Sequence, residues 1–153
     1  MYRKFLITIG LGILVLLVSS YFFLKKDQNS PDKNPITGQT ITINGVKLAV
    51  DIADEPQEQA QGLSGKKFMA EDRGMLFIFP QSLMPSFWMK DMNFSLDLIW
   101  IDASGIIIGI EKNVRPDTYP RTLSPPSPIK YVLEVNAGWS DRNNIQSGDV
   151  VLF

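Results

Sequence analysis

Four polar residues lie within or at the ends of strongly apolar runs of the sequence, namely Lys90, Asp97, Glu134 and Asn136. Burying a charge without a partner costs several kcal/mol, so these side chains should be paired or exposed. We expect one or two structural salt bridges and a side-chain cap. The alternative is a ligand-binding or catalytic cluster, because charged residues in such positions often mark a site.

A carboxylate pair is the catalytic arrangement that these residues suggest. Asp97 and Glu134 could act as in glycoside hydrolysis, one protonated and one ionised, if they opened on one cleft roughly 5 to 10 Å apart. Lys90 is a further weak catalytic candidate. Side chains alternate along a strand, so Asp97 shares a face with Ile99 and Glu134 shares one with Asn136. The relation between these two faces is open, so a hydrolase stays the alternative to a non-catalytic domain.

The sequence contains no cysteine and no histidine. Disulfides, thiol nucleophiles, zinc sites built on sulfur or imidazole, and Ser-His-Asp triads are therefore excluded. No glycine-rich nucleotide loop and no EF-hand spacing is present. We expect no cofactor, and any catalysis would have to use Asp, Glu, Lys, Ser, Thr or Tyr.

All methionines except Met1 fall between residues 69 and 92. Thioether sulfur is a soft ligand that suits Cu(I), and the candidate ligands are Met75, Met84, Met89 and Met92. Methionine also fills irregular cores, and no tight metal-box spacing is visible. Core packing is therefore the prediction, and copper binding is an alternative hypothesis.

An aromatic platform around Trp88 and Trp139, with Asn136 beside it, would suit contact with a sugar or a peptide. The leading hypothesis is therefore a non-catalytic binding or interaction module whose candidate partners are an envelope protein, a peptide or a glycan. The chain beyond residue 35 is mildly acidic and would repel phosphate backbones, so no nucleic-acid partner is expected.

Residues 5–24 carry no charge. As a helix rising about 1.5 Å per residue, they would span roughly 30 Å, the thickness of the bilayer hydrocarbon. We expect a transmembrane signal-anchor, and the alternative is secretion after cleavage near Ser19-Ser20. A slight excess of positive charge before the span favours a cytoplasmic N-terminus, which would put the rest of the chain on the extracytoplasmic side.

Three regions follow: an anchor at residues 1–24, a flexible linker at 25–39 and a β domain at 40–153. The linker is polar and contains Pro31 and Pro35, so it offers no apolar face. In the domain, Asn44-Gly45 predicts a tight hairpin, and Asp54, Pro56 and Gly62 predict one short helix.

The expected fold is mainly β, a compact β-sandwich or irregular barrel, because short strands recur with turn signals between them. A proline-rich loop at residues 112–129 is either functional or an inert crossover. Residues 141–144 should form a solvated turn. The predicted strands are residues 40–44, 46–52, 74–79, 86–90, 96–101, 106–111, 130–136 and 150–153.

Five strings occur in a fixed order: RGMLFIF at 73–79, FWMK at 87–90, LDLIWID at 96–102, KYVLEVNAG at 130–138 and Gly148-Asp149. Together they resemble domain-of-unknown-function family 192, also called uncharacterised protein family 0127, over residues 40–153. The resemblance implies a compact β-sandwich-like domain, commonly exported or membrane-tethered, with no established activity. Family members usually have arginine where Gln59 stands, and Asp91-Met92 replaces a more usual Asn-Thr. If these positions belong to a site, that site is altered in this chain.

Overall fold

The first hairpin forms where the sequence predicts it. The computed structural model describes residues 38–153. Its first strands, β1 (Gln39–Ile43) and β2 (Val46–Ala53), are joined by Asn44 and Gly45, whose φ angles are 50° and 81°. A two-residue turn with both φ values positive matches the right-handed twist of the strands, and Asn and Gly adopt it at little cost. The strand pairing is antiparallel, as a hairpin requires.

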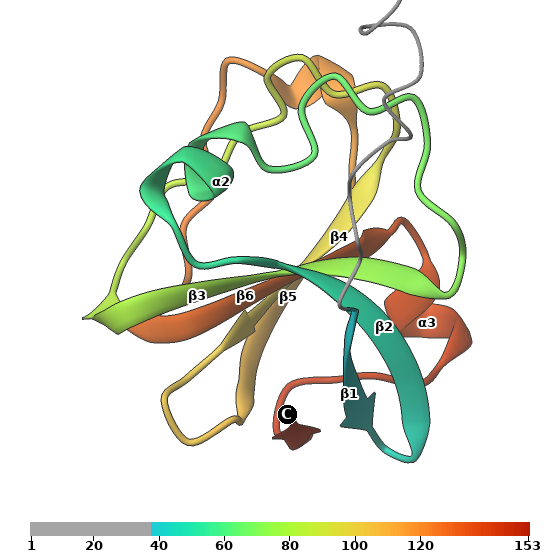
Figure 1. Cartoon of the computed structure of the whole chain (residues 1–153), viewed down its shortest axis with the longest axis vertical. Helices are drawn as coiled ribbons and strands as arrows, with labels where there is room; N and C mark the ends of the chain where they lie inside the picture. Colours follow the sequence, from blue (N-terminus) through green and yellow to red (C-terminus); the bar gives the residue numbers. More distant parts are fainter. Residues whose placement is uncertain (1–37) are drawn as a thin grey trace, which may run out of the picture. The chain divides into compact units, whose positions relative to one another are not determined.

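Within the described residues, seven strands form one strongly twisted sheet in the order β5-β4-β6-β3-β2-β1-β7 (Figure 1). The pairing of β2 with β3 is parallel, and the other pairings are antiparallel. The remaining strands are β3 (Arg73–Leu83), β4 (Leu96–Ile101), β5 (Ile107–Val114), β6 (Ile129–Asn136) and β7 (Val151–Leu152). The mainly β prediction is confirmed, but the sandwich alternative is wrong because all these strands share one sheet.

The two edges of the sheet approach each other at one end. Ile106 and Val150 form an isolated antiparallel bridge. The Val151 amide donates to the Gly105 carbonyl at 2.8 Å, and the Ile107 amide donates to the Asp149 carbonyl at 2.9 Å. The sheet therefore curls into a partly closed barrel, in line with the irregular-barrel alternative.

One predicted helix is confirmed, and two short helical segments were not predicted. The helix α2 (Pro56–Gln61) begins after Glu55, one residue later than expected, and ends at Gly62, which has a φ of 50°. The unpredicted segments are η1 (Pro116–Thr118) and α3 (Trp139–Arg142). The turn expected at 141–144 is therefore partly wrong, since a four-residue helix is too short to show an apolar period.

The predicted strand at residues 86–90 is wrong. Only Phe87 pairs, in an isolated bridge with Leu123 in the segment that follows η1. Both side chains belong to the cover of the sheet, because Leu123 is buried and Phe87 packs against the same cluster. The apolar run Phe87-Trp88-Met89 satisfies a covering segment as well as a strand, and periodicity alone does not distinguish the two.

Two clusters of buried side chains lie on opposite faces of the sheet. The first contains Ile99 and Val135 together with Trp139 of α3. The second contains Leu98 and Val132 and is joined by Leu63, just after α2. Side chains alternate along each strand, so neighbouring residues of β4 and of β6 enter different clusters. In Figure 1, α2 and the long connecting segments lie over one side of the sheet.

The predicted membrane span at residues 5–24 lies outside the described residues, as does nearly all of the linker. From residue 38 to residue 153, none of the helices is long and apolar enough to cross a bilayer.

Candidate functional site

Glu134 lies on the central strand β6, between β3 and β4. The antiparallel register sets it opposite Met75 on β3 and opposite Leu98 on β4. Directly opposed residues point to the same face of a sheet, so this carboxyl stands between two apolar neighbours. Only 7% of Glu134 is exposed. The expectation that Glu134 is paired or exposed is therefore wrong, because the side chain is buried and no ion pair of residues 38–153 includes it.

A pocket of about 260 Å³ opens above Glu134. Its walls come from strand β3, from the end of α2 with the turn after it, and from the segment at 85–92. In the described part of the chain, Glu134 is the only lining residue with an ionisable side chain, and four of the others are aromatic. The lining includes Phe77, Phe79, Phe87, Trp88, Gln59 and Met92.

The aromatic wall is fixed by edge-to-face contacts. The rings of Phe77 and Phe87 have centroids 5.0 Å apart at 82°, and those of Phe87 and Trp100 are 5.6 Å apart at 73°. Edge-to-face pairs of this kind add stability beyond the area that they bury. Trp88 is 51% exposed, so its ring is accessible to a bound group and to solvent.

Burial raises the pKa of Glu134 from its ordinary value of 4.5 to about 8. No hydrogen-bond or ion-pair partner for its carboxyl occurs among residues 38–153. With a pKa near 8, roughly nine tenths of the carboxyl is protonated at pH 7. A protonated carboxyl offers one O–H donor and acceptor oxygens, whereas the ionised form only accepts. The pocket therefore contains one group that changes its recognition chemistry near neutral pH.

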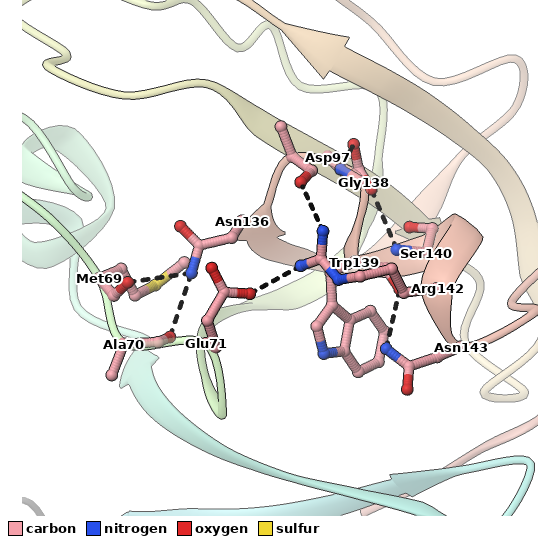
Figure 2. A network of polar contacts seen from close by, with 11 residues as sticks. Met69, Ala70, Glu71, Asp97, Asn136, Gly138, Trp139, Ser140, Arg142 and Asn143 are labelled. Atoms are coloured by element: carbon pink, nitrogen blue, oxygen red, sulfur yellow. Dashed lines mark hydrogen bonds and ion pairs between the residues drawn. The ribbon is translucent and has the colours of Figure 1, made fainter.

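Asp97 lies on the opposite face of the sheet from Glu134 and has a structural role. It is 0% exposed, and its oxygens accept backbone N–H bonds from Asn113 at 2.8 Å, Gly138 at 3.1 Å and Ser140 at 3.1 Å. The bonds from Gly138 and Ser140 hold the start of α3 against the buried carboxylate (Figure 2). The proposed carboxylate pair is therefore wrong, because two carboxyls on opposite faces of one sheet cannot act on the same bond.

Asn136 and Lys90 also lie outside the pocket. The Asn136 side chain donates to the carbonyls of Met69 at 3.0 Å and Ala70 at 3.1 Å, and so it holds the chain before β3 (Figure 2). Arg142 of α3 reaches the same segment through an ion pair with Glu71 at 2.7 Å. Lys90 is exposed, which is one of the two outcomes expected for it. Within residues 38–153 none of the four polar residues takes part in a salt bridge, so the predicted salt bridges are wrong. The predicted cap has a counterpart, because Asp97 and Asn136 bond to backbone groups through their side chains.

The proposed platform of Trp88 and Trp139 is wrong. Trp139 is only 4% exposed and packs in the first core cluster, whereas Trp88 borders the pocket on the other side of the sheet. One of the two tryptophans is therefore accessible to a ligand.

The methionines contribute chiefly to packing. Met75 and Met89 are buried in the second core cluster, Met92 packs against that cluster and lines the pocket, and Met84 is 55% exposed. Core packing is therefore confirmed for three of the four candidate ligands. Among the described residues, no group of three or more acidic side chains could hold a metal ion. Copper binding by sulfur stays an untested alternative hypothesis.

Both positions at which the chain departs from the resembled family border the pocket. Gln59 lines it and donates its side-chain amide to the carbonyls of Ile78 at 2.9 Å and Ala53 at 3.3 Å. Met92 lines it as well. The phenylalanines of the wall were not predicted, because only the folded sheet brings Phe77 and Phe87 together over Glu134. For Gln59 and Met92, the family resemblance was the signal that singled out the positions.

Comparison with known proteins agrees with the fold. The model of the DUF192 family, described as Uncharacterized ACR, matches residues 39–153. A proposed transcription regulator from Sinorhizobium meliloti 1021 is 35% identical, with a TM-score of 0.66, over 69% of this chain and 81% of its own. A protein of unknown function from Novosphingobium aromaticivorans is 27% identical, with a TM-score of 0.72, over 78% of this chain and 89% of its own. No curated protein matches.

The match over residues 39–153 includes every strand that the structure describes, together with Glu134 and the walls of its pocket. The chain therefore belongs to the DUF192 family of uncharacterised proteins.

Proposed function

We propose that the domain is a non-catalytic binding module that takes its ligand in the pocket over Glu134, and that residues 5–24 hold it on the extracytoplasmic side of a membrane. The observation that carries the first part is a buried carboxyl that has no partner among residues 38–153, placed in a largely apolar pocket. Concave apolar sites with a few convergent polar groups are the usual form of a small-ligand site.

The energetics of Glu134 support a role in binding. Burial of this carboxyl disfavours its charged form, so the folded domain is less stable at neutral pH than it would be with an apolar residue there. A ligand that supplies the missing hydrogen bond or charge would offset this cost. Perturbed ionisable groups in pockets are frequently functional for that reason.

The described lining of the pocket contains no nucleophile that is activated by a base. Its two serines have other contacts: Ser64 donates to the carbonyl of Lys90 at 3.0 Å, and Ser86 lies 3.4 Å from the hydroxyl of Ser124. Nucleophilic catalysis requires a base within hydrogen-bond reach of the hydroxyl. Glu134 as a lone acid fits ligand recognition better than bond cleavage.

The size of the pocket limits what it can take. About 260 Å³ is slightly below the range of roughly 300 to 1,000 Å³ that is common for drug-sized ligands. A small molecule or one side chain of a partner fits that volume. A glycan or a peptide would then place one group in the pocket and the remainder on the surface beside Trp88.

A pocket-filling variant tests the binding site. Ala60 is exposed on α2 and lines the pocket, so Ala60→Phe should occupy the opening without disturbing the core. Ala70→Phe adds the same ring at an exposed position outside the pocket and is the matched control. In a thermal-shift screen of small molecules, ligands that stabilise the wild type and Ala70→Phe should fail to stabilise Ala60→Phe. If every stabilising ligand acts equally on all three chains, the pocket is not the site.

The proposed extracytoplasmic placement of the β domain needs a separate test. Protease added to intact spheroplasts that express the full chain should remove the β domain while cytoplasmic markers survive. A protected domain would contradict the extracytoplasmic placement.

A further inference from the structure

The charge and the aromatic rings of the pocket are complementary to a positive ligand. Among residues 38–153, its lining contains one acidic side chain, Glu134, and no lysine or arginine. The faces of aromatic rings carry partial negative charge and attract cations placed within about 6 Å of the ring centroid, with tryptophan the strongest. A carboxyl beside several aromatic rings is therefore suited to an organic cation.

We propose that the pocket binds an organic ammonium group, which pairs with Glu134 while its carbon substituents contact Phe79, Phe87 and Trp88. This inference rests on the proposed function and names the class of its ligand. The ammonium supplies the one charge that the lining lacks, and the alkyl part replaces water against the apolar walls. A neutral ligand would use only the apolar walls and one hydrogen bond.

Binding of a cation is coupled to loss of the Glu134 proton. The ammonium is attracted by the ionised carboxyl, and burial keeps that form scarce below a pH of about 8 because it raises the pKa of Glu134. At pH 7, binding therefore releases roughly 0.9 proton from Glu134 to solvent, and at pH 9 roughly 0.1. The apparent association constant should rise roughly ninefold from pH 6 to pH 7, roughly fivefold to pH 8 and roughly twofold to pH 9.

Other ionisable groups near this face do not line the pocket. Two acidic residues lie in the same row of directly paired residues as Glu134, each about two strand spacings or 10 Å away. Asp51 lies beyond Met75 and is ion-paired with Arg73 and Lys66. Glu111 lies beyond Leu98 on the other side. The remaining groups on the elements around the pocket are Lys130 on β6, Glu55 and Glu58 at α2, and Lys90 and Asp91 in the covering segment. Glu134 alone should therefore give the pH profile its shape.

Calorimetric titration of the full chain in an uncharged maltoside detergent tests the proposal. Butylammonium is the cationic probe, because an alkyl ammonium stays charged from pH 6 to pH 9. Butan-1-ol is its neutral counterpart. Butylammonium should bind at least tenfold more tightly than butan-1-ol at pH 8, with the pH profile and the proton release given above.

Three variants assign the effect to the pocket. Glu134→Gln should lose at least tenfold in butylammonium affinity and lose the pH dependence. Trp88→Leu changes an exposed ring, so it should fold normally, weaken binding severalfold and keep the pH profile. Glu111→Gln removes a carboxylate from the same face outside the pocket and should keep both the affinity and the profile.

Three results would overturn the ammonium assignment. The first is butan-1-ol binding as tightly as butylammonium. The second is a butylammonium affinity that falls above pH 8, since the protonated carboxyl would then be the recognised form. The third is no butylammonium binding at any pH while the Ala60→Phe screen still identifies pocket ligands. In each case the binding module stands and its ligand class is wrong. If the screen also finds no ligand that Ala60→Phe excludes, the proposed function fails as well.

An ammonium group can belong to a free amine or to a lysine side chain, and a further titration separates these sources. Nα-acetyl-lysine methylamide presents the same butylammonium unit on a peptide backbone. Binding at least tenfold tighter than butylammonium would assign the pocket to a polypeptide partner, and equal or weaker binding would assign it to a free small amine.

Discussion

Replacing Glu134 with glutamine should stabilise the domain, and the gain should grow with pH. Burial raises the pKa of Glu134 from 4.5 to about 8, so the unfolded chain loses this proton several pH units before the folded domain does. Because the folded pKa is the higher one, the contribution of Glu134 to stability is fully present below pH 4.5 and is lost as the pH rises through 8. The loss is about 1.4 kcal/mol per pH unit, about 3 kcal/mol at pH 7 and about 5 kcal/mol in total.

Glutamine keeps the size of the side chain and removes the ionisation, so it isolates this effect. Urea unfolding of a chain that begins at Ile36, followed by tryptophan fluorescence, gives the free energy of unfolding between pH 5 and pH 8. The advantage of Glu134→Gln over the wild type should increase by about 3.5 kcal/mol across that range. Glu111→Gln is the matched control and should not reproduce the increase. A constant difference between Glu134→Gln and the wild type would refute the account of a buried, protonated carboxyl.

Two further predictions concern contacts near the site or beneath it in the sheet, and a third concerns the boundary of the domain. Asp97→Ala should lower the free energy of unfolding by at least about 3 kcal/mol, because it leaves one buried and two partly buried backbone N–H groups without their charged acceptor; a loss under 1 kcal/mol by denaturant unfolding would be inconsistent with that role. Gln59→Arg adds a guanidinium to the pocket wall and should lower the pKa of Glu134 and weaken butylammonium at least tenfold, measured by carboxyl NMR and calorimetry; unchanged values would place residue 59 too far from Glu134. The chain that begins at Ile36 should be soluble and unfold cooperatively with a β-rich circular dichroism spectrum, whereas the full chain should stay in the membrane fraction through a carbonate wash; aggregation of the shorter chain would make residues 1–35 part of the core.

Local chemistry made part of the fold predictable. Asn44-Gly45 determines its turn through the φ angles that these two residues tolerate, and Pro56 with Gly62 bounds a helix by the same kind of local constraint. The segment at 86–90 had no such constraint. Its three consecutive apolar residues fit a strand and a covering segment equally, and only contact with Leu123 decides between them. The parallel pairing of β2 with β3 depends on distant contacts and was not predicted.

The sequence indicated that Glu134 is a candidate site residue, but it did not indicate where in the fold the site lies. Glu134 stands out in the sequence because a carboxyl within an apolar strand is costly, and that reasoning applied equally to Asp97. The register between β4 and β6 separates them, since it puts Glu134 opposite Leu98 and Asp97 opposite Val135, on the other face. Neither the composition of the sequence nor the spacing of its residues determines how β4 pairs with β6. The same limit explains why Trp139 was placed with Trp88, although α3 buries it in the other cluster.

The ionisation of Glu134 in the free and the ligand-bound protein is the most direct test of the account. Carbon-13 NMR of the side-chain carboxyl, assigned by comparison with Glu134→Gln, follows this ionisation from pH 4 to pH 10. The account predicts a titration midpoint near pH 8 in the free protein, and a midpoint at least one unit lower when butylammonium is saturating. A midpoint near 4.5 in the free protein, or one that does not move with the ligand, would contradict it.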